Sequence, residues 1–337
     1  MRKIDIFTHI YPRAFYDRLL QVAGDFKDVG KRSRGVPMLY DLDERFRVMD
    51  KFEGYTQILS LPTPPVEVVA DKPQATELAR IANDGMAGLV RRYPDRFAGF
   101  VAALPFNDPD EAAREARRAI ADLGACGIQM YSNVNGKPIS APHLLPLFET
   151  MASCDLPIWL HPYRGPAWSD YPAEDKSAYE IWWTFGWPYE TSVAMARIVF
   201  AGLFDRFPGL KIISHHMGAM APYFAGRIGP GWDQLGARTS DEDLSLVLKR
   251  LKKRPIDYFK MFYADTALFG AFEATVCGLS FFGVDKVLFA SDAPFDPEKG
   301  SMYIRETIAV VDRLPISNLE REQIYWRNAA ALLKLPQ

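Results

Sequence analysis

Four apolar stretches of this 337-residue sequence each end in a histidine or an aspartate. The polar residues at these ends are His9, His161, the adjacent pair His215 and His216, and Asp292. Imidazole and carboxylate groups together suit a divalent metal ion such as zinc or manganese. We therefore expect a metal site if the fold brings the four ends together. The fifth histidine, His143, follows Pro142 at a predicted helix start, and we interpret it as structural.

Short apolar segments alternate with helical segments along the chain. The predicted strands are residues 3–10, 56–61, 97–104, 127–131, 157–161, 211–215, 258–264 and 285–290. Parallel strands need crossover helices and are buried on both faces, so this order predicts an α/β fold, a single (β/α)8 TIM barrel over residues 1–337. An open doubly wound sheet is the alternative, but no Gly-x-Gly-x-x-Gly follows the first strand. Barrel active sites lie at the C-terminal strand ends, where the four polar ends would meet.

Two long connections are expected near the mouth of the barrel. Residues 13–42, after the first strand, form an insertion of mixed composition, and we interpret residues 31–35 within it as a mobile loop over the site. Residues 163–187, after the fifth strand, are rich in aromatic side chains: Tyr163, Trp182, Trp183, Phe185 and Trp187. These predict an aromatic wall for a flat substrate, with ordinary core packing as the alternative for at least half of them.

Composition narrows the class of partner. Forty basic and 42 acidic residues leave a net charge of -2 without a long run of one sign, so neither nucleic acid nor an anionic membrane is an expected partner. The three cysteines (Cys126, Cys154 and Cys277) are widely spaced, which favours free thiols in a reducing compartment over a disulfide framework. With no signal peptide and no apolar run of the roughly 20 residues that span a bilayer, we expect a cytoplasmic protein with a small-molecule ligand.

Several motifs together resemble one protein family. They are Asp-x-x-x-His at residues 5–9, Gly127-Ile128-Gln129 through Gly136, His161-Pro162, Pro208 to Lys211 leading into residues 216–222, and Ser291 to Phe295. Nearly the whole chain resembles the amidohydrolase-related family, in the branch that contains aminocarboxymuconate-semialdehyde decarboxylase and gamma-resorcylate decarboxylase. The resemblance implies that His9, His161 and Asp292 hold a metal. It also implies that His216 is an acid/base group beside Asp292.

One position departs from the family pattern. The family carries His-x-His or Glu-x-His on the first strand, and Phe7 stands where the first of these ligands is expected. Asp5 shares the strand face of Phe7 but sits two residues deeper, so we do not assign it to the metal. We expect a working but labile metal site with open positions. His215 and His216 are neighbours on a predicted strand and should face opposite ways, so only one of them can enter the barrel mouth. The resemblance implies His216, because the family's His-x-Gly spacing fits it, and we interpret His215 as structural.

The resemblance also implies substrate-binding residues and an assembly. Arg227 matches an arginine that reaches the substrate carboxylate of a neighbouring subunit, so a homodimer is expected. Arg45 and Arg47, on the predicted helix before the second strand, match an arginine-containing stretch of the family, although a solvated helix face explains them equally well. Trp183 and Tyr163 complete the predicted substrate site.

We therefore predict a metal-dependent nonoxidative decarboxylase of a small aromatic or ring-opened carboxylic acid. One alternative is a hydrolase or hydratase on the same fold, in which the metal activates water. Another is a binding protein that lost its metal together with the missing ligand.

Overall fold

The computed structural model describes residues 1–24, 29–238 and 241–335. Its parallel strands are β1 (Lys3–His9), β2 (Tyr55–Ser60), β3 (Phe97–Phe100), β4 (Ile128–Tyr131), β7 (Ile158–His161), β8 (Ile212–Ser214), β9 (Tyr263–Asp265) and β10 (Val287–Leu288). They form two sheets, one in the order β1-β2-β3 and the other in the order β10-β9-β8-β7-β4. A short antiparallel hairpin, β5 (Asn133–Val134) with β6 (Lys137–Pro138), lies beyond β4.

Two seams join the sheets into a closed barrel. At one seam, Ala102 after β3 pairs in parallel with Ile128 of β4. At the other, Thr8 of β1 pairs in parallel with Ala293, and the Ile6 N–H donates to the Phe289 carbonyl oxygen at 3.0 Å. The strands of the described chain therefore form the predicted parallel barrel of the α/β class.

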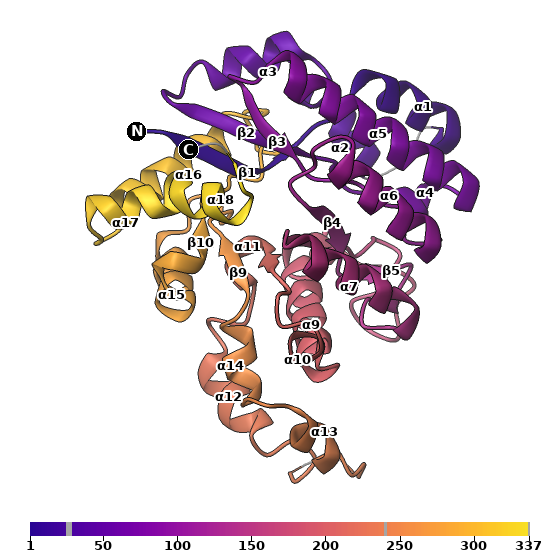
Figure 1. Ribbon diagram of the computed structural model, residues 1–337, viewed down its shortest axis with the longest axis vertical. Coiled ribbons are helices and arrows are strands. Elements are labelled where there is room, and N and C mark those ends of the chain that lie inside the picture. Colours follow the sequence, from indigo (N-terminus) through magenta and orange to yellow (C-terminus); the bar gives the residue numbers. More distant parts are fainter. Residues whose placement is uncertain (25–28, 239–240, 336–337) are drawn as a thin grey trace.

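Helices surround the barrel. Those in the first half of the chain are α1 (Arg13–Ala23), α2 (Val29–Arg34), α3 (Leu42–Met49), α4 (Val66–Val69), α5 (Lys72–Arg92), α6 (Pro109–Ala121) and α7 (Leu145–Cys154). Those that follow are α8 (Ile181–Thr184), α9 (Gly186–Phe200), α10 (Leu203–Arg206), α11 (His215–Gly218), α12 (Ala225–Trp232), α13 (Ser245–Arg250), α14 (Pro255–Phe259), α15 (Phe272–Phe282), α16 (Met302–Arg313), α17 (Asn318–Glu322) and α18 (Asn328–Leu332). Figure 1 shows α12, α13 and α14 projecting at the lower end, away from β1 and β2.

Helix starts follow local capping chemistry. The Asp71 side chain accepts from the Gln74 N–H at the start of α5, and Asp108 does the same for the Glu111 N–H at the start of α6. Each cap satisfies one backbone donor that the first turn leaves free, which stabilises the helix by about 1 kcal/mol. The starts of these two helices are therefore encoded by local sequence.

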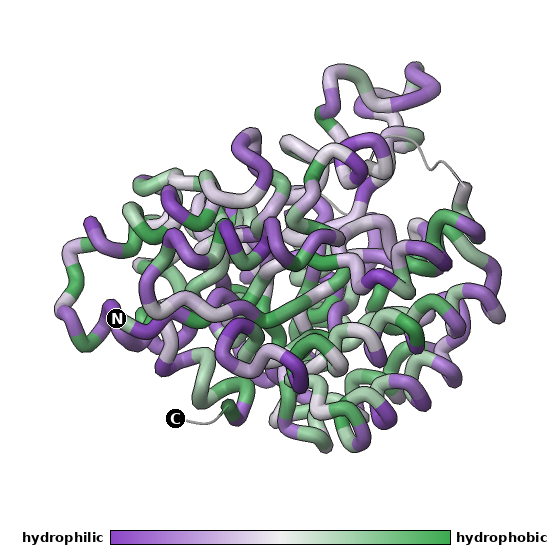
Figure 2. Tube along the Cα trace, turned by 90° about the horizontal axis from the view of Figure 1, so that it is seen from above, coloured by the Kyte–Doolittle hydropathy of each residue, from purple (hydrophilic) through white to green (hydrophobic). Residues whose placement is uncertain are grey.

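Burial of the strands explains their apolar sequences. One core cluster joins buried side chains of different strands, among them Phe7, Ile58, Trp159, Ile213 and Leu288. Figure 2 shows hydrophobic stretches in green crossing the interior of the trace. Full burial of such a side chain contributes about 1.5–3 kcal/mol, so the strands tolerate few polar residues except at their ends.

Three expectations about local structure were wrong. The seventh strand begins at Tyr263 rather than 258, because Pro255 starts helix α14 and Tyr258 lies within that helix. The third strand ends at Phe100, four residues earlier than expected. Residues 31–34 are the C-terminal part of α2 rather than a loop, while residues 25–28 of the expected insertion lie outside the described part of the chain.

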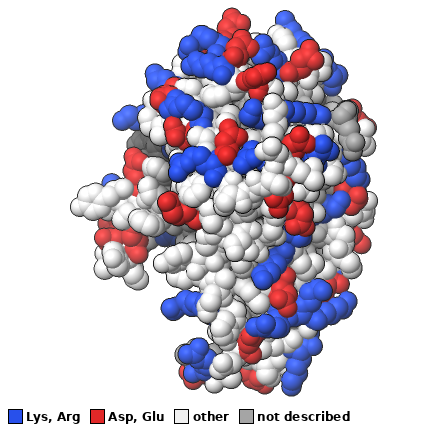
Figure 3. Space-filling view, turned by 90° about the vertical axis from the view of Figure 1, so that its left-hand side faces the viewer, with Lys and Arg blue, Asp and Glu red and all other residues white. Residues whose placement is uncertain are grey.

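The described helices are all too short or too polar to cross a membrane. Figure 3 shows basic and acidic side chains interspersed over one face of the molecule, with neither sign forming a continuous patch there.

Candidate metal centre

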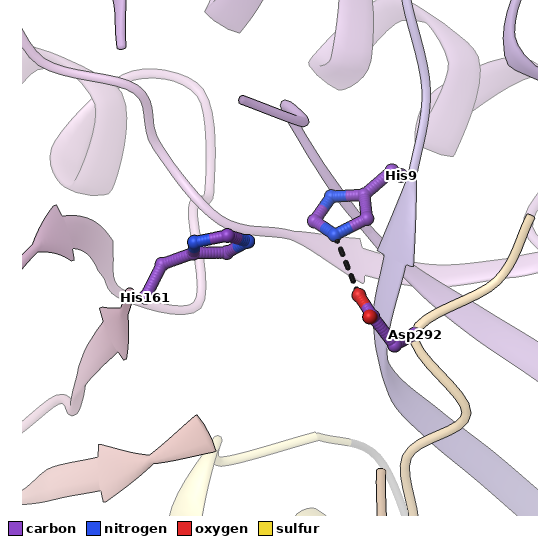
Figure 4. A group of neighbouring side chains, drawn as sticks. All are labelled: His9, His161 and Asp292. Carbon is purple, nitrogen blue, oxygen red and sulfur yellow. Dashed lines mark hydrogen bonds and ion pairs between the residues drawn. The ribbon is translucent and has the colours of Figure 1, made fainter. Parts of the chain in front are cut away.

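The ends of three strands bring together the predicted metal ligands (Figure 4). His9 ends β1, His161 ends β7, and Asp292 lies four residues beyond β10. His9 Nε2 lies 2.9 Å from Asp292 Oδ1, and ligand atoms of all three residues lie within 4.8 Å of one another. All three side chains are buried.

Hydrogen bonds behind the two imidazoles orient them for a metal. His161 Nδ1 lies 2.7 Å from the Pro162 carbonyl oxygen, which can only accept, so the proton is on Nδ1 and Nε2 keeps its lone pair. His9 Nδ1 lies 3.1 Å from Ser60 Oγ, whose hydroxyl donates to the Thr8 carbonyl and so accepts from Nδ1. Partners of this kind fix the tautomer of metal-binding histidines. The donor set of two imidazoles and one carboxylate therefore fits a divalent metal.

The ionisation states in this group also suit a metal. Burial would raise the pKa of Asp292, but the positive charge of His215 and hydrogen bonds from nearby histidines hold it well below its usual range. Burial lowers the pKa of His161 well below its usual value, and the histidines His215 and His9 lower it further. A charged carboxylate beside a neutral imidazole is what metal ligation requires.

Both histidines of the adjacent pair approach Asp292, contrary to the expected alternation. His215 Nε2 lies 3.4 Å from Asp292 Oδ1, and His216 Nε2 lies 3.6 Å from Asp292 Oδ2. Strand β8 ends at Ser214, and His216 has a left-handed backbone conformation with φ of 55°. Alternation holds only within a strand, so the turn lets both side chains face the same carboxylate.

The carboxylate of Asp265 holds this turn in place, and sequence reasoning missed it. Asp265 Oδ2 accepts from His215 Nδ1 at 2.5 Å, while Oδ1 accepts from the backbone N–H groups of His216 and Ala267. Burial alone would lower the pKa of His215, but Asp265 and Asp292 outweigh it and raise the pKa to about 9. The missed signal was an aspartate at the end of the seventh strand, because the predicted strand stopped at residue 264.

Phe7 is buried at the centre of the imidazole group. Its ring stacks on the His215 ring at 3.8 Å between centroids and 14° between planes. The same ring lies 5.5 Å from His9 and 5.6 Å from His161. The residue that departs from the family pattern therefore packs directly against the ligand group.

Asp5 has a structural role. Its carboxylate accepts from Tyr55 Oη at 2.6 Å, from the Ser291 N–H at 3.0 Å and from the Ser291 hydroxyl. Burial raises the pKa of Asp5 to about 6, although these bonds oppose the rise. Asp5 ties β1 to the turn that carries Asp292, as expected for a residue not assigned to the metal.

A cavity of about 360 Å³ lies above the predicted metal ligands. His9, His161, His216 and Asp292 line its floor. Its wall is largely aromatic: Trp182, Trp183, Trp187, Phe269, Phe295 and Tyr303, with Leu268. Three of the five expected aromatic side chains therefore line the cavity. Phe185 is exposed, and Tyr163 lies outside the lining, with its ring centroid 6.2 Å from that of Tyr131.

Cationic side chains line the mouth of the cavity. Lys31 and Arg32 come from α2. The Arg32 guanidinium lies 5.3 Å from the Trp183 ring and 5.2 Å from the Phe295 ring, and its Nη2 donates to the Phe295 carbonyl at 2.5 Å. Two rings and a carbonyl thus hold this cation in place. Sequence reasoning did not single it out, because it lay in a segment read as a mobile loop.

Two predicted substrate arginines lie away from this cavity. Arg47 is exposed on α3 and pairs with Glu44 at 2.5 Å. Arg227, on α12, lines a separate hollow beside Trp232. The buried neighbour Arg45 instead donates to the His9 carbonyl and to Gln57 Oε1, which positions the end of β1.

Comparison with known proteins agrees with this geometry. Residues 39–335 match the family described as amidohydrolase. The chain is 35% identical to gamma-resorcylate decarboxylase of Polaromonas sp. (strain JS666) over 302 residues, which cover 87% of each chain. It is 30% identical to 2-amino-3-carboxymuconate-6-semialdehyde decarboxylase of Dictyostelium discoideum over 309 residues, covering 87% of this chain and 82% of the relative.

A solved relative carries a metal. The structure of dihydroxybenzoic acid decarboxylase from Polaromonas sp. JS666, with bound manganese and the inhibitor 2-nitroresorcinol, has a TM-score of 0.77 and 31% identity to this chain. The match covers 99% of this chain and 97% of the relative. The family match, the sequence identities and the barrel agree, and this chain belongs to the amidohydrolase family.

Proposed function

We propose that the cavity binds a small aromatic or ring-opened carboxylic acid and that its floor removes the carboxyl group. The chain is a metal-dependent nonoxidative decarboxylase, a carboxy-lyase related to gamma-resorcylate decarboxylase. The observation that carries the proposal is the group of His9, His161 and Asp292 under an aromatic wall. Aromatic side chains of such a wall bind a flat ring by stacking.

His9, His161 and Asp292 would hold the divalent metal, which supplies Lewis-acid attraction for substrate oxygens. Manganese, present in the solved relative, and zinc both accept this donor set. Proton transfer and substrate binding are assigned to side chains of the protein.

His216 and Asp292 form the proton-carrying pair. His216 lines the cavity with its Nε2 3.6 Å from Asp292 Oδ2, so this pair can deliver a proton to the ring carbon that bears the carboxylate. The bond from that carbon to the carboxylate then breaks, carbon dioxide leaves, and the electron pair returns to the ring. One proton replaces one carbon dioxide, with no oxidant and no water consumed.

Lys31 and Arg32 would attract the anionic substrate at the mouth. A guanidinium binds a carboxylate through two parallel hydrogen bonds, and the two rings that hold Arg32 limit the side-chain entropy lost on binding. The segment between β1 and β2 would in this way act as the predicted insertion over the site.

We also propose a homodimer in which Arg227 approaches the partner's site. The support is a set of exposed aromatic side chains, Phe185 and Tyr189 at the start of α9 and Tyr223 two residues before α12. The Met220 N–H donates to Ser192 Oγ of α9, which holds the turn bearing Tyr223 beside this helix. Exposed apolar patches of this kind mark protein interfaces.

The test is turnover of 2,6-dihydroxybenzoate by the manganese-loaded protein, with the phenolic product measured by chromatography. We expect carbon dioxide release without oxygen uptake, and incorporation of labelled bicarbonate when the product is supplied instead. Dialysis against a chelator should abolish both. Hydrolysis of an ester or amide without any carboxylate exchange across a panel of aromatic acids would contradict the proposal. Sedimentation of an active enzyme as a strict monomer would contradict the homodimer.

A further inference from the structure

The imidazole of His216 is held differently from the other two histidines that line the cavity. Nδ1 of His9 lies 3.1 Å from a serine hydroxyl, and Nδ1 of His161 lies 2.7 Å from a backbone carbonyl oxygen. Nδ1 of His216 is buried and has no hydrogen-bond partner among the described residues. Its Nε2 lies 3.6 Å from Asp292 Oδ2, beyond the roughly 3.2 Å of an ordinary hydrogen bond. The orientation of this imidazole therefore depends on the rings that pack against it.

Two rings contact the His216 imidazole. The His215 ring lies 3.8 Å away between centroids, and the Phe269 ring lies 5.5 Å away with 60° between the planes. Tilted rings at about 4.5–7 Å between centroids form favourable aromatic contacts. Phe269 lines the cavity beside His216, whereas His215 lies outside the lining. Phe269 is in turn packed against Tyr303 of α16, with 4.3 Å between centroids, so its ring is supported from a second element.

The backbone of Phe269 has a conformation that a bulky residue rarely adopts. Its φ is 56°, in the left-handed region, and the φ of Gly270 is 96°. A Cβ atom at Gly270 would lie 3.0 Å from that of Glu306, so glycine allows the turn to approach α16 closely. A strained residue persists only where the surrounding structure holds it, and such residues cluster at functional sites.

Hydrogen bonds on both sides anchor the segment that carries this turn. Strand β9 ends at Asp265, whose carboxylate accepts from the backbone N–H of His216 at 3.0 Å. The hydroxyl of Thr266 donates to the Ala290 carbonyl oxygen at 3.0 Å and accepts from the Ala290 N–H at 2.9 Å. The turn is thus tied to the segments that follow β8 and β10, which carry the two members of the proposed proton-carrying pair.

We propose that Phe269 is a positioning residue for His216. Its ring, fixed by the left-handed turn and by Tyr303, holds the imidazole at the cavity surface in place of the hydrogen bond that Nδ1 lacks. The inference rests on the proposed function, in which His216 delivers the proton. A residue of the substrate wall would govern substrate binding, whereas a positioning residue governs the proton step.

Steady-state kinetics with 2,6-dihydroxybenzoate separate these two roles. Phe269→Leu keeps apolar bulk but removes the flat ring, so we expect kcat to fall about 10–100-fold while KM changes by less than about threefold. An unchanged kcat, with or without a rise in KM, would overturn the proposal. The control Phe281→Leu removes a half-buried ring on α15, packed 4.9 Å from Phe282 and outside the cavity lining, and should leave both constants unchanged.

A crystal structure of Phe269→Leu gives a measurement that does not depend on activity. We expect the His216 imidazole in more than one rotamer or turned away from Asp292, with the backbone at Asp265 in place. A single imidazole in the wild-type orientation would overturn the proposal even if kcat falls. If wild type turns over no aromatic acid while the imidazole moves in the variant, the proposed function fails and the positioning role of Phe269 stands.

A second variant carries the same test if Phe269→Leu does not fold, as judged by circular dichroism. Tyr303→Leu removes the ring that supports Phe269, so we expect kcat to fall at least about threefold and the His216 imidazole to move. Where both single variants fold, the double variant should lose no more kcat than Phe269→Leu alone, because the two rings act through one contact. A multiplicative loss would overturn the supporting role of Tyr303.

Discussion

The floor and the mouth of the cavity are built in different ways. Floor residues such as His9 and His161 come from strand ends, and backbone or side-chain hydrogen bonds fix each imidazole. Mouth residues such as Arg32 and Trp183 come from the short helices α2 and α8, which lie between strands. A rigid floor suits chemistry, where sub-ångström placement matters, while a wall on connecting segments can vary with the substrate.

The difference separates two kinds of effect. Changes at the floor should abolish turnover while substrate affinity changes less, because the floor residues are the proposed ligands of the metal and the proposed carriers of the proton. Changes at the mouth should weaken substrate binding while the chemical step continues.

The largest effect is expected at the floor. His161→Ala and Asp292→Asn should each lower kcat by at least about 10³-fold, because each removes a proposed metal donor and the second also removes the carboxylate proposed to carry the proton. Their far-ultraviolet circular dichroism should match wild type. Near-normal kcat in both variants would show that the reaction takes place elsewhere.

A smaller effect is expected at the mouth. Arg32→Gln should raise KM for an aromatic acid about 10–100-fold, the equivalent of losing hydrogen bonds from a charged group, and leave kcat within a few-fold. Arg13→Gln, which removes an exposed arginine paired with Asp17, is the matched control. A fall in kcat at constant KM would instead assign Arg32 to the floor.

Two buried carboxyl groups, one at the floor of the cavity and one on α4, have pKa values shifted in opposite directions. Asp292 has its pKa held low by histidines, whereas burial raises the pKa of Glu67, on α4, to about 8. Above its ordinary pKa of 4.5, unfolded Glu67 releases its proton while the folded group keeps it, so wild-type stability falls as pH rises toward about 8. Glu67→Gln removes this dependence.

Thermal unfolding measures the effect. Between pH 5 and pH 9, Glu67→Gln should gain about 4 kcal/mol relative to wild type, because the folded pKa lies about three pH units above pH 5 and each unit is worth about 1.4 kcal/mol. The difference in Tm should grow by several degrees. Parallel pH profiles of the two proteins would mean that Glu67 does not titrate in this range.

The smallest effect is expected at Arg47. Because it pairs with Glu44 on an exposed helix face, Arg47→Gln should change KM by less than about twofold. A tenfold rise in KM would restore the substrate role that its sequence context suggested and would place α3 at the mouth.

The sequence, together with the family that it resembles, determined the barrel and the four residues at the floor, His9, His161, His216 and Asp292. In a parallel barrel, a polar residue that ends an apolar segment is expected to lie at the mouth of the barrel. Buried strands carry few polar side chains except at their ends, and active-site residues lie at the C-terminal ends. His9, His161 and Asp292 satisfy that condition, so their meeting followed once the strands were placed.

Tertiary structure decided the residues that lie outside regular strands. The left-handed turn at His216 brings His215 and His216 to the same carboxylate, and Asp265 holds that turn from a strand whose bounds the sequence misplaced. Arg32 lies at the mouth because of where α2 packs, and Arg47 lies on the surface because of where α3 packs. Side-chain direction at a turn or on a connecting segment depends on contacts distant in sequence, which no local pattern encodes.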